Sequence, residues 1–315
     1  MTKWLRLIRI QNLVIIALLQ YFLRYWLIIP ILNSYGIEPV LSDFRFALLM
    51  ISTICLAASG YVINDYFDIR IDKINRPLKV VVGISLSRRK ALMLHIILTS
   101  VGLLLGYFLA YVTRKENYMV MFTLIPILLW VYTTTLKKQV LIGNLAISAL
   151  TALVAYVVVS IEFAALARRL GESIFESPAC DKAWFWTTGF AFFAFMSNLM
   201  REIIKDVEDM KGDQINGCRT LPIALGLKYT RTIIILMAGF SIAALWILYF
   251  SVPQLSQSNL TIAYFALAIT LPYLLLSLFI RKAKKPAQFH TASLLSKAIM
   301  LSGILYLLVA GSFFN

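Results

Sequence analysis

The sequence predicts an all-α, polytopic membrane protein with about nine transmembrane helices. Hydrophobic residues make up 60% of the 315-residue chain and charged residues only 14%, and the mean hydropathy is +0.81. Soluble domains contain roughly 25% charged residues, so this composition is typical of a membrane protein. Apolar runs of about 20 residues, each long enough to cross a bilayer core about 30 Å thick, recur along the whole chain.

The apolar runs divide the chain into spans joined by short polar segments. We expect spans at residues 11–33, 46–64, 91–112, 118–136, 141–162, 184–201, 231–252, 261–280 and 296–314. Because no Gly-, Ser- or Pro-rich linker separates them, the sequence predicts one intramembrane domain over residues 1–315. The segment 163–183 is expected to be an ordinary solvated loop between two spans. The basic N-terminus is not read as a signal peptide, because its apolar stretch is too long and lacks a small-residue cleavage site.

The basic residues predict the orientation of these spans. Of the 30 Lys and Arg residues, 23 lie in segments on the side of the N-terminus, six lie in the opposite segments and Arg24 lies within the first span. The positive-inside rule therefore places the N-terminus in the cytoplasm and, with nine spans, the C-terminus outside. We expect a multi-pass protein of the cell membrane, in which the net charge of +15 matches anionic lipid headgroups rather than nucleic acid.

The cysteine and histidine residues indicate no site of their own. The three cysteines have no CxxC spacing, which argues against a disulfide framework and a thiolate metal site. The two histidines are isolated in the sequence, and we expect no functional role for them.

The acidic residues are concentrated in two short stretches. Eight of the 15 Asp and Glu residues lie in "NDYFDIRID" and "REIIKDVEDMKGD", and both stretches contain the pattern DxxDxxxD. At about 100° per residue, offsets of three and seven fall on one face of a helix. The first motif consists of Asp65, Asp68 and Asp72, and the second consists of Asp206, Asp209 and Asp213. Glu202, one helical turn before Asp206, is expected near the same face.

The predicted topology brings both motifs to the cytoplasmic surface. Each follows a span that runs inward, and a third inward span ends at Lys137 and Lys138. Facing carboxylates repel one another unless a cation lies between them. Mg²⁺ is the natural candidate, because it binds through a few carboxylates and the phosphates of a substrate. Nearby cations are expected to bind the remaining phosphate oxygens: Arg76, Lys79, Lys137, Arg201 and Lys205.

Both motifs resemble those of the UbiA family of intramembrane prenyltransferases. The segment from Asn64 to Asp72 matches the first family signature, NDxxDxxxD, and continues with "KINRP". The second signature resembles residues 206–213, followed by "NGCRTLPIALG". The resemblance covers essentially the whole chain and implies a UbiA-type helical bundle with an active-site cap on the cytoplasmic side. Within the family, "REIIKDVEDMKGD" and "LKKQVLIGN" are most similar to enzymes that prenylate a glycerol-phosphate ether lipid.

The chain departs from the family pattern in two places. The family's tyrosine–lysine signature is often YxxxK, whereas the spacing from Tyr132 to Lys137 is one residue longer. The segment after "NRP" lacks the Ser-Gly found in many members.

The resemblance implies transfer of a prenyl group from its allylic diphosphate to a lipophilic acceptor, with Mg²⁺ as the cofactor. Each acidic motif is expected to hold one Mg²⁺. Asp65, Asp68, Asp206, Lys137 and Tyr132 are the expected catalytic residues. Asn64 is expected to orient an aspartate or to contact a metal-bound oxygen. The partners are then a prenyl diphosphate, a lipophilic acceptor and membrane lipids, while protein partners are not indicated.

Several alternatives remain at this point. The acceptor is either a glycerol-phosphate ether lipid or an aromatic compound, such as a quinone precursor or a haem or chlorophyll ring. An ion-coupled transporter is less consistent with the sequence, because transporter acids lie near the bilayer midplane rather than beyond the ends of spans. The DGxxAR…GxxxDxxxD signature of the CDP-alcohol phosphotransferases is absent.

Overall fold

The computed structural model describes residues 3–314, apart from the side chain of Lys79, and is helical almost throughout. No strand occurs among these residues, which contain only an isolated bridge between Val82 and Leu86. The predicted all-α class is therefore confirmed. The chain divides into two compact units, one comprising Met1–Leu136 with Leu153–Thr188 and the other Lys137–Ala152 with Gly189–Asn315.

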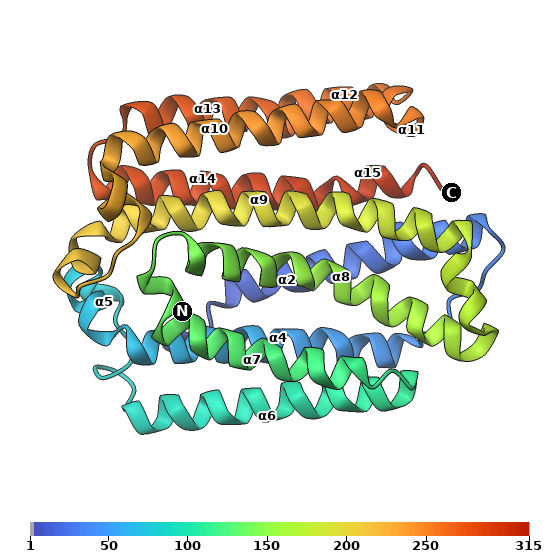
Figure 1. Ribbon diagram of the computed structural model, residues 1–315, viewed down its shortest axis with the longest axis horizontal. Coiled ribbons are helices and arrows are strands. Elements are labelled where there is room, and N and C mark those ends of the chain that lie inside the picture. The colour runs from blue at the N-terminus through green and yellow to red at the C-terminus, as the bar shows by residue number, and fades with distance from the viewer. Residues whose placement is uncertain (1–2, 315) are drawn as a thin grey trace. The chain divides into compact units, whose positions relative to one another are not determined.

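The first unit begins with short helices and continues with three long ones (Figure 1). In chain order its elements are α1 (Lys3–Leu7), α2 (Ile10–Phe22), the π-helix η1 (Leu23–Ile28), α3 (Ile29–Ser34), α4 (Asp43–Phe67), α5 (Ile69–Asn75), the 3-10 turn η2 (Pro77–Lys79), α6 (Arg88–Thr113) and α7 (Asn117–Thr134). Helix α4 packs against both α6 and α7. The contact is close because glycines face it: a Cβ on Gly102 would lie 2.7 Å from Leu56 Cγ. The Ser52 hydroxyl also donates a 2.7 Å hydrogen bond to the Gly102 carbonyl.

Two long helices run through both units. They are α8 (Ile142–Leu170), preceded by the 3-10 turn η3 (Leu136–Lys138), and α9 (Pro178–Ile215), preceded by the 3-10 turn η4 (Glu172–Glu176). The predicted solvated loop at 163–183 is therefore wrong. Helix α8 continues to Leu170, and Phe163 and Leu166 are fully buried. The arginines at 168 and 169 mark the end of this helix, where cations are favoured, rather than its absence.

The second unit contains the C-terminal helices (Figure 1). They are α10 (Leu221–Ser251), α11 (Pro253–Ser256), α12 (Asn259–Tyr264), the π-helix η5 (Phe265–Thr270), α13 (Leu271–Lys282), α14 (Pro286–Leu305) and α15 (Leu307–Gly311). Helix α13 packs against α10 and α14. A 2.8 Å hydrogen bond between the hydroxyls of Ser197 and Tyr273 joins α9 to α13. Gly303 lets α14 approach α9, since a Cβ there would lie 2.1 Å from Phe193 Cε1.

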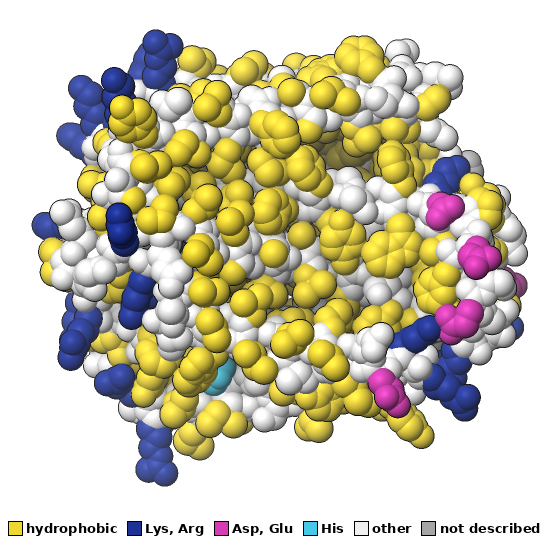
Figure 2. All heavy atoms as spheres, in the orientation of Figure 1, with side chains coloured by type: hydrophobic (Ala, Val, Ile, Leu, Met, Phe, Trp, Pro, Cys, Tyr) yellow, Lys and Arg dark blue, Asp and Glu magenta, His cyan; other side chains and the backbone are white. Residues whose placement is uncertain are grey.

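The surface matches a membrane environment. Eight helical segments in the described part of the chain are long and apolar enough to cross a bilayer, and they correspond to eight of the nine predicted spans. The ninth, 184–201, lies within the 38-residue helix α9 but is less apolar, because it contains Thr187, Ser197 and Asn198. On the face drawn in Figure 2 hydrophobic side chains cover most of the surface. The chain is thus an integral, multi-pass membrane protein.

Candidate active site

The first acidic motif lies where α4 passes into α5. Asp65 belongs to α4, Asp68 lies at the junction with φ −85° and ψ 2°, and Asp72 belongs to α5. The backbone bonds continue across the junction, because the Asp68 N–H donates to the Asn64 carbonyl at 3.0 Å and the Asp72 N–H to the Asp68 carbonyl at 2.8 Å. The helical register is therefore kept, and the three carboxylates remain neighbours, as the spacing predicts.

A small hydrophobic core supports this end of α4. It consists of Leu7, Val62, Val81, Val82, Leu86 and Ala91, all of which are buried. Partly buried Tyr66 and Ile69 pack against this core. The core therefore fixes the first motif between the N-terminal helix, the end of α4 and the segment before α6.

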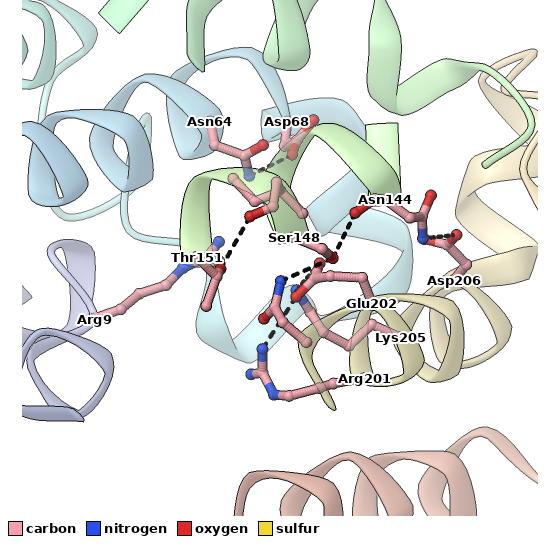
Figure 3. Close-up of polar contacts among 12 residues, drawn as sticks. Arg9, Asn64, Asp68, Asn144, Ser148, Thr151, Arg201, Glu202, Lys205 and Asp206 are labelled. Atoms are coloured by element: carbon pink, nitrogen blue, oxygen red, sulfur yellow. Dashed lines mark hydrogen bonds and ion pairs between the residues drawn. The ribbon is translucent and has the colours of Figure 1, made fainter. Parts of the chain in front are cut away.

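The carboxylates of the first motif interact strongly with one another. Burial raises the pKa of Asp72 to about 6, and the charges of Asp68 and Asp65 add to the shift, while Arg9 and Arg76 oppose it. A raised pKa means that the ionised form of Asp72 is destabilised at this site. The Asn64 amide donates a 2.8 Å hydrogen bond to Asp68 Oδ2 (Figure 3). This contact matches the orienting role expected for Asn64.

Arg9 is a member of this cluster that the sequence analysis did not identify. Its Nη2 lies 2.9 Å from Asp65 Oδ1, and its guanidinium lies 5.0 Å from the centroid of the Tyr61 ring. The backbone of Arg9 is left-handed, with φ 52° and ψ 54°, which is uncommon for a residue other than glycine. In the sequence Arg9 is one of several basic residues near the N-terminus, and no local pattern links it to a carboxylate 56 positions later.

The second acidic motif lies on α9, which continues without a break through Asp206, Asp209 and Asp213. Burial raises the pKa of Asp206 well above its ordinary value, and the charges of Glu202 and Asp213 add to the shift. Two groups oppose it: the Asn144 amide, which donates a 2.8 Å hydrogen bond to Asp206 Oδ2, and the charge of Lys205. Both Glu202 and Asp213 therefore act on Asp206, as the predicted shared face requires.

Basic residues accompany the second motif on the same helix. Arg201 Nη1 lies 3.1 Å from Glu202 Oε1, and Lys205 Nζ lies 2.9 Å from Glu202 Oε2 (Figure 3). Glu202 is 9% exposed, so this carboxylate is buried between two cations. Glu202, one helical turn before Asp206, therefore holds the side chains of Arg201 and Lys205 by ion pairs.

The other predicted site residues lie at helix ends. Arg76 follows α5 directly and is partly buried, whereas the predicted phosphate ligand Lys79 has a side chain outside the described part of the structure. Tyr132 is partly buried near the end of α7 in the first unit. Lys137 belongs to the second unit and is partly buried, while the neighbouring Lys138 is exposed. Lys137 is thus the less exposed of the two lysines.

The residues of the two motifs fit a hard divalent cation. Their carboxylate oxygens are the donors that Mg²⁺ prefers, and a cation would relieve the repulsion that raises the pKa of Asp72. Within residues 3–314 no three Asp, Glu, His or Cys side chains converge as a complete metal site. This finding is compatible with Mg²⁺, which binds through one or two carboxylates together with substrate phosphates and water.

Comparison with known proteins gives a consistent result. The model of the UbiA prenyltransferase family matches residues 26–301. Two similar curated proteins are digeranylgeranylglyceryl phosphate synthases. The one from Sulfurisphaera tokodaii is 32% identical over 72% of this chain and 71% of its own length, and the one from Thermococcus kodakarensis is 28% identical over 90% and 92%. Among solved structures, a UbiA homologue from Archaeoglobus fulgidus bound to DMAPP and Mg²⁺ superimposes with a TM-score of 0.57, at 16% identity over 98% of this chain and 99% of its own.

Proposed function

The chain belongs to the UbiA prenyltransferase family, and from this membership we propose that it transfers a prenyl group to the hydroxyl of a glycerol-phosphate ether lipid. The donor is an allylic prenyl diphosphate. In the reaction the bond between C1 of the prenyl group and the diphosphate oxygen breaks, and C1 forms a bond to the acceptor oxygen, which loses its proton. The acceptor assignment is supported by the names of the two curated relatives.

The observation that carries the proposal is the pair of DxxDxxxD motifs, one across the α4–α5 junction and one on α9, each with an asparagine bonded to one of its aspartates. We assign one Mg²⁺ to Asp65, Asp68 and Asp72 and another to Asp206, Asp209 and Asp213. Bound Mg²⁺ supplies Lewis-acid neutralisation of the charge that builds up on a departing diphosphate. On the sequence argument that both motifs follow inward-running spans, we place both motifs on the cytoplasmic side of the cell membrane, with the N-terminus in the cytoplasm.

The cationic side chains have a separate task in this proposal. Arg76, Lys79, Lys137, Arg201 and Lys205 bind the diphosphate oxygens and hold the leaving group in place. Fixed positive charge where negative charge develops is the largest expected contribution to the rate. Asn64 and Tyr132 complete the set: Asn64 orients Asp68, with which it forms a hydrogen bond, and the Tyr132 ring would stabilise the allylic carbocation by a cation–π contact.

The test is a transfer assay with purified protein, Mg²⁺ and a radiolabelled geranylgeranyl diphosphate. The acceptor panel contains geranylgeranylglyceryl phosphate, its dephosphorylated analogue and an aromatic quinone precursor. The proposal predicts labelled product mainly with the phosphorylated ether lipid. Preferred labelling of the quinone precursor would instead favour an aromatic acceptor, and the absence of diphosphate release with every acceptor would contradict the enzyme assignment.

The proposed orientation has its own test. A cysteine introduced next to the first motif, in a variant that lacks Cys55, Cys180 and Cys218, should react with a membrane-impermeant maleimide in inverted vesicles and not in intact cells. Labelling in intact cells would contradict a cytoplasmic site.

A further inference from the structure

Each acidic motif contains one aspartate that accepts a hydrogen bond from an asparagine amide. In the first motif Asn64 Nδ2 donates to Asp68 Oδ2 at 2.8 Å, and in the second Asn144 Nδ2 donates to Asp206 Oδ2, also at 2.8 Å (Figure 3). The first donor lies one turn earlier on the same helix as its aspartate. The second donor lies on a different helix, α8, and is 62 positions away from Asp206 in sequence. The same local arrangement is therefore built in two different ways.

The second arrangement is buried and anchored. Asn144 is 7% exposed, Asn198 6% and Ser148 0%. The Ser148 hydroxyl accepts a hydrogen bond from Asn198 Nδ2 at 3.3 Å and donates one to the main-chain carbonyl of Asn144 at 2.6 Å. The Ser148–Asn198 and Asn144–Asp206 hydrogen bonds thus connect α8 to α9 at two positions one helical turn apart on α8, which keeps the Asn144 side chain close to Asp206.

Burying an amide inside a membrane helix needs a physical reason. An amide left without a partner costs about 1–3 kcal/mol, and polar groups within membrane helices are frequently functional. The Ser148–Asn198 hydrogen bond already links α8 to α9, so packing of the two helices does not require a second polar contact at Asn144. The Asn144 amide instead donates to a carboxylate, and a charge-assisted bond of this kind is roughly twice as strong as a neutral one.

A hydrogen-bond donor at Oδ2 also restricts the orientation of the Asp206 carboxylate. The hydrogen bond restricts rotation of the carboxylate about the Cβ–Cγ bond. Partners of this kind, which touch a ligand residue rather than the metal, typically change metal affinity roughly 10- to 100-fold when they are removed.

We propose that Asn144 is a positioning residue that holds Asp206 through Oδ2 and leaves Oδ1 for a divalent cation. The inference rests on the metal role proposed for Asp206. It assigns Asn144 no contact with the substrate, so its whole effect passes through that one carboxylate.

The experiment is a double-mutant cycle read out by metal binding rather than by prenyl transfer. Mn²⁺ is titrated into the detergent-purified full chain, and free Mn²⁺ is measured by electron paramagnetic resonance. The variants are Asn144→Leu, which is close in size but has no donor, Asp206→Asn, and the two combined. The matched control is Ser197→Ala, which removes a buried hydrogen bond between α9 and α13 and does not touch Asp206.

The expected result is a site that Asp206→Asn weakens and that Asn144→Leu weakens roughly 10- to 100-fold. The double variant should bind Mn²⁺ within about twofold of Asp206→Asn alone, because coupled residues are not additive, and Ser197→Ala should resemble the wild type. If Asn144→Leu does not fold, Ser148→Ala replaces it as a milder loosening of the same anchor, with a smaller loss expected.

Two results would overturn the inference, and only the second would also contradict the metal role proposed for Asp206. If Asp206→Asn weakens Mn²⁺ binding but Asn144→Leu does not, or if the two effects add fully, only the role of Asn144 is wrong. If Asp206→Asn leaves the affinity of every Mn²⁺ site unchanged, both the metal assignment of Asp206 and the role of Asn144 are wrong.

Discussion

Removing the Glu162 side chain should destabilise the first unit, because this carboxylate is the buried partner of a buried arginine. Arg24 is 2% exposed and Glu162 0%, and Arg24 Nε donates to Glu162 Oε2 at 2.8 Å. Glu162 Oε1 also accepts a 3.3 Å hydrogen bond from the Leu41 N–H. Arg24 lies in the π-helix η1, where the irregular turn places it among these acceptors.

The magnitude follows from what remains after Glu162→Ala. Breaking a buried ion pair by removing one partner costs about 3–5 kcal/mol, since the other charge stays buried. Two acceptors survive, the Leu41 carbonyl and Asp43 Oδ1, the latter 2.7 Å from Arg24 Nη1. The Asp43 side chain is 81% exposed, so its compensation is limited to about 1 kcal/mol. We therefore expect a net loss of about 2–4 kcal/mol.

The assay is reversible unfolding in mixed micelles of a mild detergent and dodecyl sulfate, followed by maleimide labelling of the buried thiols Cys180 and Cys218. Glu172→Ala is the matched control, because its 2.9 Å pair with Lys115 is exposed and should contribute under about 1 kcal/mol. The double variant Arg24→Leu/Glu162→Leu should recover most of the lost stability, because it leaves no buried charge. A loss below 1 kcal/mol for Glu162→Ala, or a double variant as unstable as the single one, would refute this reasoning.

Three further predictions concern packing and the metal. Gly303→Ala should lower the free energy of unfolding by about 1–3 kcal/mol in the same assay, because its Cβ would overlap the Phe193 ring. Gly239→Ala, at a position with open space around it, should have no such effect. Equal effects of the two substitutions would contradict the close contact. The pKa of Asp72 is raised to about 6, so this carboxyl gains a proton as the pH falls through 6. The Mg²⁺ concentration for half-maximal transfer should therefore rise between pH 7 and pH 5. A Mg²⁺ requirement that does not change over this range would contradict the prediction. Chelation with EDTA should abolish transfer and added Mg²⁺ should restore it, unless the metal assignment is wrong.

Hydropathy predicted most of the fold because each span is a local property of about 20 consecutive residues. It failed at 163–183, where a solvated loop is predicted after a span ending at Glu162, although α8 continues to Leu170. Side-chain charge alone does not end a helix, and the burial of Glu162 depends on Arg24, which is 138 positions away. No local pattern contains that pairing.

The candidate site, like the fold, was predictable where it depends on local sequence and not where it depends on contacts between separate helices. The spacing of the aspartates fixed the two motifs, since three carboxylates on one helical face require only helical geometry. The contacts of Asp65 with Arg9 and of Asp206 with Asn144 depend on the packing of separate helices. In the sequence Arg9 is one of the basic residues that indicate topology, and nothing local links Asn144 to Asp206, 62 positions later.

Prenyl transfer by three forms of the protein tests the central claim most directly. Wild type, Asp65→Ala and Asp206→Ala are compared at saturating Mg²⁺ with labelled geranylgeranyl diphosphate and geranylgeranylglyceryl phosphate, and Glu176→Ala, an exposed acid outside both motifs, serves as the control. We predict labelled product from the wild type and from Glu176→Ala. In each aspartate variant, transfer should be reduced at least about 100-fold. Full activity in both aspartate variants would contradict the assignment of the two motifs to the reaction.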